Sequence, residues 1–455
     1  MQIKRVTCCG MRLACVIAFL VCCVRLVAIP GNEKSRAKRP PMGWNSWDSY
    51  GTAVREEQVK ANADAMAREL SRFGWQYIVV DIQWYEPSAG GHEYRAGAAL
   101  TMDEYGRLLP APNRFPSAAR GAGFKKLAAY VHAEGLNFGI HIMRGIPRQA
   151  VELNLPILGT SYRAADIADR VNVCEWNPDM YGVDMSKPGA QAYYDSIVAL
   201  YADWGVDFIK ADDMGRPYAL RAPEVHALRS AIRKSGASIL LSLSPGPAPI
   251  SEAADLRDNA QLWRISDDFW DDWKLLKKQF DYTRDWAPYI AKDDTWPDAD
   301  MLPLGKLRIT DKNGAPQQTR FTSDEQQTMM TLWSMFRSPL IFGGDLPSAD
   351  PATLALLTNR EVLEIDQNSS GNRQVLERGN IRVWTAAAAG RTDEYAAAFN
   401  LGDVAETIHL SWTDVGIRVA DPAVRDLWQH KNLGRQKNLD VTLRPHASAL
   451  YRVAP

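Results

Sequence analysis

Two apolar segments of the chain each end in a cation followed closely by a carboxylate. One segment carries Lys210 and Asp212, and the other carries Arg264 and Asp268. Each segment is typical of a buried strand whose polar residues follow at its C-terminal end. In a barrel of parallel strands, that end is where chemistry takes place. Two carboxylates brought there from different strands are what the cleavage of a glycosidic bond requires.

The spacing within each segment predicts which side chains share a face. Because side chains alternate along a strand, Lys210 and Asp212 face one side and Asp213 faces the other. A neighbouring lysine lowers the pKa of a carboxyl group, so Asp212 is the candidate nucleophile. Arg264 and Asp268 also share a face, and we expect Asp268 to lie in a drier place, as suits a general acid. A structural ion pair that closes the strand is the alternative.

Further polar and aromatic residues are expected at the same rim. Asp81 ends an apolar run and is a candidate acceptor for sugar hydroxyls, and His141 is either a wall of the pocket or a buried core histidine. Trp47 and Trp84 are candidate sugar platforms, because an indole face suits the apolar face of a pyranose, and core packing is the alternative for both. Asp300 follows a later strand and is expected to fix a loop.

The elements that must position these residues alternate between strand and helix patterns over residues 40–367. The strand runs are apolar on both faces, as parallel strands covered by helices require. This alternation predicts an α/β domain, either a (β/α)₈ TIM barrel or a doubly wound sheet. The expected strands are Met42–Ser46, Tyr77–Trp84, Asn137–Met143, Val206–Asp213, Ser238–Ser244, Gln261–Asp268 and Pro339–Phe342. The expected helices are Arg55–Phe73, Gly123–Glu134, Lys187–Trp204, Pro223–Ser235, Trp270–Tyr289 and Ser323–Arg337.

Two of these helices carry capping signals. Gly205 follows the third helix as a C-cap glycine should. Ser323, with Gln326 three residues on, predicts a capping box at the start of the last helix.

After residue 367 the pattern changes to short alternating stretches separated by turn residues. This spacing predicts a small antiparallel β-sandwich over residues 368–455. The expected strands are Ile381–Thr385, Tyr395–Leu401, Glu406–Ser411, Ile417–Val419, Val441–Leu443 and Ala449–Val453.

The N-terminal segment has the features of an export signal. Lys4 and Arg5 precede an apolar run, which predicts a signal peptide over residues 1–28 and a polar linker over residues 29–39. We therefore expect a secreted or periplasmic protein. The apolar run is short for a membrane span, so no integral membrane association is expected.

Composition and cysteine usage narrow the possible partners. The net charge is −1, from 53 basic and 54 acidic residues, which does not favour nucleic acid as a partner. Outside the export signal only Cys174 remains, so no intramolecular disulfide is expected. The seven histidines lack metal-site spacing and no phosphate-binding glycine loop is present, so neither a metal nor another cofactor is expected. The oligomeric state stays open.

These motifs resemble glycoside hydrolase family 27, the α-galactosidase or melibiase family. The stretch Pro40–Trp47 is similar to the opening strand of that family. Lys210 with Asp212 resembles its nucleophile motif, and Arg264 with Asp268 resembles its acid/base motif.

The resemblance covers roughly residues 36–455 and implies a (β/α)₈ barrel followed by an antiparallel β domain. It also implies metal-free hydrolysis of terminal α-galactosides with retention, with Asp212 as nucleophile and Asp268 as acid/base. Retention requires the two carboxyl groups to lie roughly 5–6 Å apart. The candidate substrate-binding residues are Trp47, Asp81, Ile82, Trp84, His141, Lys210 and Arg264.

Ile82 departs from the family pattern. Many members carry a second Asp directly after the one that matches Asp81, and that Asp binds galactose hydroxyls. An isoleucine instead presses apolar bulk against the C5 substituent, which arabinopyranose lacks, so a β-L-arabinopyranosidase is the rival within the family. Ser244-Pro245-Gly246 also stands where many relatives carry Cys-Glu-Trp, and Met214 and Ser244 replace disulfide cysteines.

Together these features predict a retaining exo-acting glycoside hydrolase that releases terminal α-D-galactosyl residues from oligo- or polysaccharides. A β-L-arabinopyranosidase is the first alternative. A non-catalytic carbohydrate-binding pseudoenzyme is the second alternative. A Schiff-base aldolase that uses Lys210 is a further rival, but a lysine so close to Asp212 should stay charged.

Overall fold

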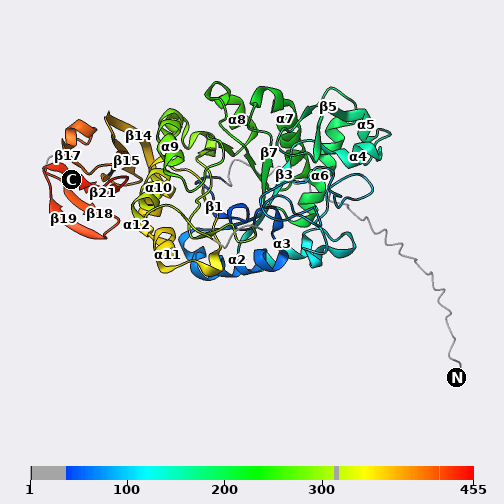
Figure 1. The fold of residues 1–455 in the computed structure, drawn as a ribbon, viewed down its shortest axis with the longest axis horizontal. Coiled ribbons are helices and arrows are strands. Elements are labelled where there is room, and N and C mark those ends of the chain that lie inside the picture. The colour runs from blue at the N-terminus through cyan, green and yellow to red at the C-terminus, as the bar shows by residue number, and fades with distance from the viewer. Residues whose placement is uncertain (1, 3–36, 312–316, 420) are drawn as a thin grey trace.

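The structure, a computed structural model, describes residue 2 and residues 37–311, 317–419 and 421–455. The expected signal peptide and most of the linker therefore lie outside the described residues. Within the described part of the chain, no helix has both the length and the apolar character needed to cross a membrane. The described chain forms a large barrel domain followed by a smaller domain of β-strands (Figure 1).

Eight parallel strands form one curved sheet in the first domain. They are β1 (Met42–Asn45), β2 (Tyr77–Val80), β3 (Asn137–Met143), β7 (Phe208–Asp212), β8 (Leu240–Leu243), β9 (Leu262–Arg264), β10 (Trp296–Asp298) and β13 (Leu340–Phe342). Their order is β10-β9-β8-β7-β3-β2-β1-β13. A parallel bridge from Leu302 to Phe342 joins the segment after β10 to β13 and closes the ring. The barrel prediction is confirmed, and the doubly wound alternative is wrong.

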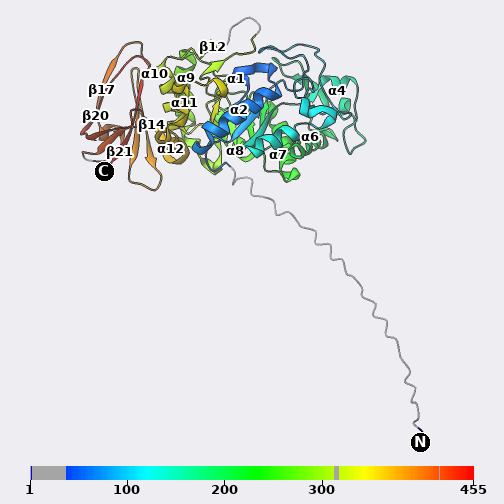
Figure 2. The same ribbon diagram turned by 90° about the horizontal axis from the view of Figure 1, so that it is seen from below.

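Helices pack around the outside of this sheet (Figures 1 and 2). They are α2 (Glu56–Glu69), α3 (Lys125–Ala133), α6 (Ala190–Trp204), α7 (Tyr218–Ser235), α8 (Ala253–Asn259), α9 (Trp273–Trp286), α10 (Ser323–Phe336), α11 (Pro351–Thr358) and α12 (Arg360–Asn368). The start expected at Pro223 is wrong, because α7 begins at Tyr218 and holds the proline inside the helix. Gly205 is confirmed as the C-cap of α6, with a φ of 84°.

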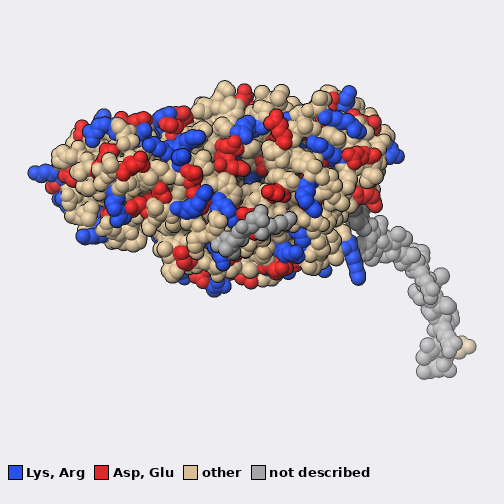
Figure 3. Space-filling model, in the orientation of Figure 1, with Lys and Arg blue, Asp and Glu red and all other residues tan. Residues whose placement is uncertain are grey.

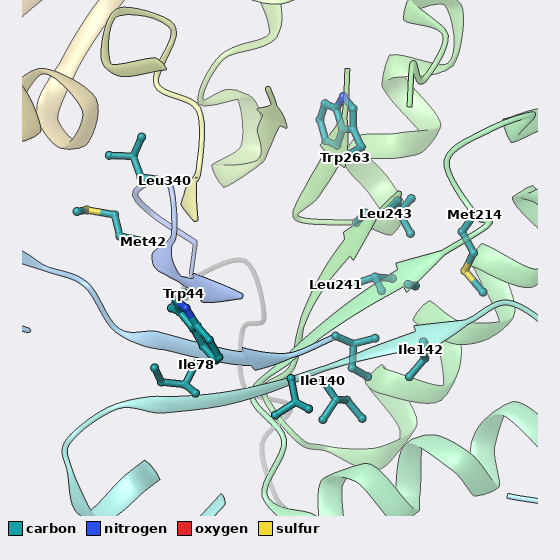
Figure 4. Close-up of a cluster of buried hydrophobic side chains, with 14 of the residues drawn as sticks. Met42, Trp44, Ile78, Ile140, Ile142, Met214, Leu241, Leu243, Trp263 and Leu340 are labelled. Atoms are coloured by element: carbon teal, nitrogen blue, oxygen red, sulfur yellow. The ribbon is translucent and has the colours of Figure 1, made fainter. Parts of the chain in front are cut away.

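The interior of the barrel is apolar at one end and charged at the other. A separate buried cluster fills the apolar end with Tyr77, Val79, Phe208, Leu240, Leu262 and Trp296. Because alternate strand residues face the same way, the next inward positions are Asp81, Lys210 and Arg264. The outward positions, such as Leu241 and Trp263, pack in the main core beneath the helices (Figure 4). The sequence alternation therefore directs charge to the C-terminal rim.

A small lobe is inserted between β3 and α6. It contains β4 (Ile146–Pro147), α4 (Arg148–Glu152), α5 (Ala164–Ile167), β5 (Ala168–Val173) and β6 (Met180–Val183). The three strands form an antiparallel sheet with β6 in the middle. Figure 1 shows the lobe at the end of the molecule farthest from the C-terminal domain. No strand or helix pattern in the sequence predicts this lobe.

The C-terminal domain consists of antiparallel strands, as expected. Its six-stranded sheet has the order β14 (Ser369–Arg378), β15 (Ile381–Ala388), β16 (Glu394–Asn400), β21 (Ser448–Ala454), β18 (Ala423–Asp426) and β19 (Lys431–Arg435). A second pair is formed by β17 (Glu406–Ser411) and β20 (Asn438–Leu443). One apolar cluster includes Val383 of the first sheet and Ile408 of the pair, which makes a sandwich. The strand expected at Ile417–Val419 is wrong.

Acidic and basic side chains lie intermixed across the face of the molecule shown in Figure 3. This distribution agrees with the near-zero net charge of the chain.

The helix α10 begins with a capping box, as predicted, but its N-cap residue is Thr322 and not Ser323. Thr322 is the N-cap, and its Oγ1 accepts a hydrogen bond from the backbone N–H of Glu325 at 3.3 Å. The side chain of Glu325 accepts from the backbone N–H of Thr322 at 2.8 Å. Glu325 also contacts His446 at 2.7 Å, so this helix start links the barrel to the C-terminal domain. Ser323 is the first helical residue rather than the cap.

Thr322→Ala should lower the midpoint of thermal unfolding, because it removes the side-chain acceptor at the start of α10. The loss expected for an N-cap is about 1 kcal/mol. Ser323→Ala is the matched control and should leave the midpoint nearly unchanged. Calorimetry of both variants makes the test, and an equal shift for the two would contradict the assigned cap.

Candidate active site

Polar residues at the C-terminal ends of the barrel strands line a cavity of about 270 Å³. They come from segments far apart in the sequence, and both candidate catalytic carboxylates are among them. The polar lining residues are Asp48, Asp81, Lys210, Asp212, Arg216, Arg264, Asp267, Asp268 and Asp300. The cavity therefore lies where the loops after the strands of a (β/α)₈ barrel meet.

Asp212 ends β7, and its side chain is 14% exposed. His141 Nε2 lies 3.1 Å from Asp212 Oδ2, and the backbone N–H of Asp213 donates to Oδ1 at 3.1 Å. Burial raises the pKa of Asp212, but the hydrogen bond with His141 and the attraction of Lys210 outweigh burial and hold that pKa well below its usual value. Asp212 is therefore ionised and oriented, as a carboxylate nucleophile must be.

The direct partner of Lys210 is Asp81, whereas the sequence pattern predicted Asp212. Lys210 Nζ donates to Asp81 Oδ2 at 2.9 Å, and Asn45 Nδ2 donates to the same oxygen at 2.6 Å. Burial lowers the pKa of Lys210, but the carboxylates of Asp81 and Asp212 raise it above its usual value. A lysine held as a cation is a poor nucleophile, which argues against the aldolase.

Asp268 lies in the loop beyond β9 and is the more exposed of the two carboxylates. Its side chain is 61% exposed, against 14% for Asp212. The expectation that Asp268 occupies the drier place is therefore wrong. The strand ends at Arg264, so the alternation that was extended to Asp268 stops before reaching it. Exposure allows Asp268 to exchange protons with water, which an acid/base that acts in two steps must do.

Arg264 connects Asp268 to a buried carboxyl group. Its side chain is 4% exposed, and Nη2 lies 3.3 Å from Asp268 Oδ1 and 2.5 Å from Asp300 Oδ2. Asp300 also accepts a hydrogen bond from the backbone N–H of Phe269 at 2.7 Å, which is a loop-fixing contact of the expected kind. Burial raises the pKa of Asp300 to about 7. The attraction of Arg264 lowers this pKa, and the repulsion of Asp268 raises it further.

Asp213 faces away from the cavity, as the alternation predicts. Arg144 Nε donates to Asp213 Oδ2 at 2.8 Å, and Arg221 Nη2 donates to Oδ1 at 3.1 Å. Arg144 also pairs with Glu224 of α7. This buried network attaches the end of β7 to α7 and so fixes the position of Asp212.

Aromatic side chains form one wall of the cavity. Trp47 and Tyr94 are stacked, with ring centroids 6.1 Å apart and an interplanar angle of 11°. Tyr94 lies 5.6 Å from Trp176, and Trp270 lies beneath the guanidinium of Arg308 at 4.4 Å. Trp47 therefore stands where a sugar platform is expected. Tyr94 was missed, because the long segment after β2 gives no strand or helix pattern.

Trp84 and His141 are both fully buried and are not among the residues that line the cavity. Trp84 Nε1 donates to the backbone carbonyl of His141 at 2.8 Å, and its ring packs against Phe124 and Trp204. The role of Trp84 as a sugar platform is therefore wrong. The chain leaves the strand before Trp84, so the residue turns into the core. His141 lies in the core but contacts Asp212, and it acts by orienting that carboxylate.

Two further residues shape the cavity beside Asp81 and Trp47. Ile82 is 2% exposed and lines the cavity next to Asp81. Asp48, in α1 (Trp47–Tyr50), is 3% exposed and was missed because only its position after Trp47 marks it. Burial raises the pKa of Asp48 well above its usual value, with repulsion from Asp300 adding to the shift. Burial therefore favours the protonated form of Asp48, which is the form that can donate a hydrogen bond.

Two further kinds of chemistry would depend on a cluster of metal ligands among the described residues or on the thiol of Cys174. Over residues 37–311, 317–419 and 421–455, no group of three His, Cys, Asp or Glu side chains gathers as a metal site would. Cys174 is buried, and burial raises the pKa of its thiol to about 12, so it is a poor nucleophile.

The chain matches family models over both domains. The model described as alpha galactosidase A matches residues 39–186 and 178–368, and that of the alpha galactosidase C-terminal beta sandwich domain matches residues 378–453. Among curated proteins, alpha-galactosidase 2 of Arabidopsis thaliana is 28% identical over 422 residues, which cover 91% of this chain and 89% of the relative.

Solved structures resemble the whole barrel and sandwich. A family 27 β-L-arabinopyranosidase from Geobacillus stearothermophilus is 52% identical with a TM-score of 0.90, covering 93% of this chain and 98% of the other. A putative alpha-N-acetylgalactosaminidase from Bacillus halodurans is 47% identical with a TM-score of 0.82, covering 91% and 97%. With family models matched across both domains, the chain belongs to glycoside hydrolase family 27, the α-galactosidase or melibiase family.

Proposed function

We propose that this glycoside hydrolase is a retaining, exo-acting β-L-arabinopyranosidase. The position of Ile82, in the cavity wall beside Asp81, carries the choice of sugar. Its side chain occupies space that the hydroxymethyl group of galactose needs and that arabinopyranose leaves free. The 52% identity to the Geobacillus β-L-arabinopyranosidase supports the same choice.

Release of terminal α-D-galactosyl residues is the second candidate. The sequence motifs alone favour it, and curated relatives such as Arabidopsis alpha-galactosidase 2 carry that activity in their names. Their identity to this chain is 28% or less among those compared, well below that of the arabinopyranosidase. The two sugars share their ring stereochemistry, so one catalytic apparatus serves either candidate.

The proposed reaction proceeds by double displacement. Asp212 attacks the anomeric carbon while Asp268 donates its proton to the leaving oxygen, which breaks the glycosidic bond and leaves the sugar esterified to Asp212. Asp268, now ionised, takes a proton from a water molecule, and the hydroxide oxygen attacks the same carbon from the opposite side. The ester bond breaks, and the free sugar leaves with its original configuration.

The cavity wall supplies groups that suit one pyranose ring. Trp47 offers an apolar face for the ring. Lys210 has three N–H donors, of which one is used by Asp81, so further donors remain for sugar hydroxyls. Arg264 lies between the acid/base and Asp300 and presents its guanidinium to the cavity.

A carbohydrate-binding protein without activity is disfavoured by the two carboxylates. Asp212 is held ionised and Asp268 is open to solvent, and binding alone requires neither condition. Binding of a glycoside without release of reducing sugar would favour this alternative.

The sugar preference can be measured with two chromogenic substrates. We expect a higher kcat/KM for p-nitrophenyl β-L-arabinopyranoside than for p-nitrophenyl α-D-galactopyranoside. Ile82→Asp should shift the ratio of the two values toward the galactoside by about tenfold or more, because it frees space and adds an acceptor. Ile82→Val is the matched control and should keep the original preference. A galactoside preference in the unmodified enzyme would contradict the assignment.

Removal of the nucleophile can be distinguished from removal of the acid/base by azide rescue. Asp212→Ala should lower kcat by about 10⁴-fold or more, the size of effect seen when a catalytic nucleophile is lost. Azide added to this variant should yield a glycosyl azide of inverted configuration, because it enters from the vacated side.

Asp268→Ala is the matched variant, and with azide it should yield a glycosyl azide of retained configuration, because Asp212 still forms the ester. The product configuration is determined by NMR. Interchanged configurations would show that the two roles have been assigned in the wrong order.

The pH profile tests the contact between His141 and Asp212. His141→Phe removes the hydrogen bond that is the largest cause holding the pKa of Asp212 down, so that pKa should rise toward its ordinary value. Asp212 must be ionised to attack, so the acidic limb of kcat/KM should move to higher pH. His141→Gln keeps a donor and should shift the limb less. An unchanged acidic limb in His141→Phe would rule out this role for His141.

A further inference from the structure

A second, more open groove of about 680 Å³ adjoins the catalytic cavity. Tyr94 and Trp176 line both the groove and the cavity. Their ring centroids are 5.6 Å apart and their planes are inclined by 49°. The cavity and the groove therefore border the same pair of rings.

The groove is built by two segments that the barrel itself does not need. Tyr94 lies in the long segment between β2 and α3, and Trp176 lies between β5 and β6 of the inserted lobe. Both segments follow barrel strands at the C-terminal rim, where loops of this fold set substrate specificity. The groove is thus an addition at the entrance of the catalytic cavity.

The exposure of Trp176 has no packing explanation. It is 39% exposed, whereas most tryptophans of the described chain are buried. Glu93, Arg148 and Glu175 line the same groove and surround the rings with charged groups. An apolar ring face bordered by hydrogen-bonding groups fits a pyranose or furanose ring, which has an apolar face and hydroxyls around its edge.

The position of Tyr94 relates the groove to the reacting groups. Burial raises the pKa of Tyr94 well above its usual value, and the nearby charges of Asp212, Asp81 and Asp268 add to the shift. Because Tyr94 and Trp176 line both spaces, a molecule that extends from the sugar in the cavity past these rings enters the groove. That molecule is the part of the substrate released when the glycosidic bond breaks.

We propose that this outer groove is the binding site for the leaving group, and that the leaving group is a second sugar whose ring stacks on Trp176. This inference rests on the proposed function and names the part of the substrate beyond the arabinopyranosyl unit. The inserted lobe then selects glycosides whose leaving group is a sugar over glycosides whose leaving group is a small alcohol.

The test compares two substrates that share the released sugar and differ in the leaving group. Methyl β-L-arabinopyranoside carries no second ring, and β-L-arabinopyranosyl-(1→6)-D-glucose carries one. Trp176→Ala should lower the ratio of kcat/KM for the disaccharide over that for the methyl glycoside by about tenfold, the size expected for one stacking contact. Trp176→Phe should restore most of the ratio.

Leu153→Ala is the matched control for a change in the same lobe. Leu153 is 65% exposed and lines neither the cavity nor the groove, so the ratio should stay as in the unmodified enzyme. An unchanged ratio in Trp176→Ala, or an equal fall in Leu153→Ala, would overturn the assignment of the groove.

The KM values of the unmodified enzyme for the two substrates give a second test. A sugar site in the groove should give the disaccharide a KM about tenfold below that of the methyl glycoside. Hydrolysis of both with equal KM would overturn the groove alone. Hydrolysis of neither would overturn the proposed function, and the groove assignment with it.

Discussion

The attraction between the ammonium group of Lys210 and the carboxylates of Asp81 and Asp212 is the interaction on which the catalytic rim depends. Burial alone favours the neutral forms of Asp81 and Asp212, because a low-dielectric surrounding penalises charge. Lys210 opposes that effect at both groups. Hydrogen bonds from Asn45 to Asp81 and from His141 to Asp212 add to this opposition, so the pKa of each carboxyl group lies below its usual value. The same carboxylates keep the lysine charged, so each member stabilises the others. Removing one partner would leave a buried charge uncompensated, which costs far more than the pair contributes.

The fold holds this charged set between two supporting layers. Below it, side chains such as Phe208 and Leu262 fill the other end of the barrel and exclude water from that side. Behind it, Arg144 links Asp213 at the end of β7 to α7. The position of Asp212 is thus fixed along the strand and across it. The open side of the rim is left to loops, which carry the groups that select the sugar.

The alternation of strand and helix patterns predicted an α/β domain, and the resemblance to the family selected the barrel. The alternation of side chains within a strand predicted the inward direction of Lys210 and Asp212, because it is a local property of the backbone. It failed at Asp268 and Trp84, where the chain has already left the strand and period two no longer holds. The inserted lobe with Trp176 was not predicted, because its strands are short and pair with segments distant in sequence. Asp48 was missed because only its position after Trp47 marks it, whereas its neighbours Arg308 and Gly343 are distant in sequence.

Trapping of the covalent intermediate tests the central claim most directly. Incubation with 2-deoxy-2-fluoro-β-L-arabinopyranosyl fluoride should form a stable ester. The fluorine at C2 slows both the formation and the hydrolysis of that ester, whereas the good leaving group at C1 speeds its formation alone. Mass spectrometry of the digested protein should place the added sugar on the peptide that contains Asp212. A label on the peptide of Asp268, or on any other carboxylate, would contradict the account of this site.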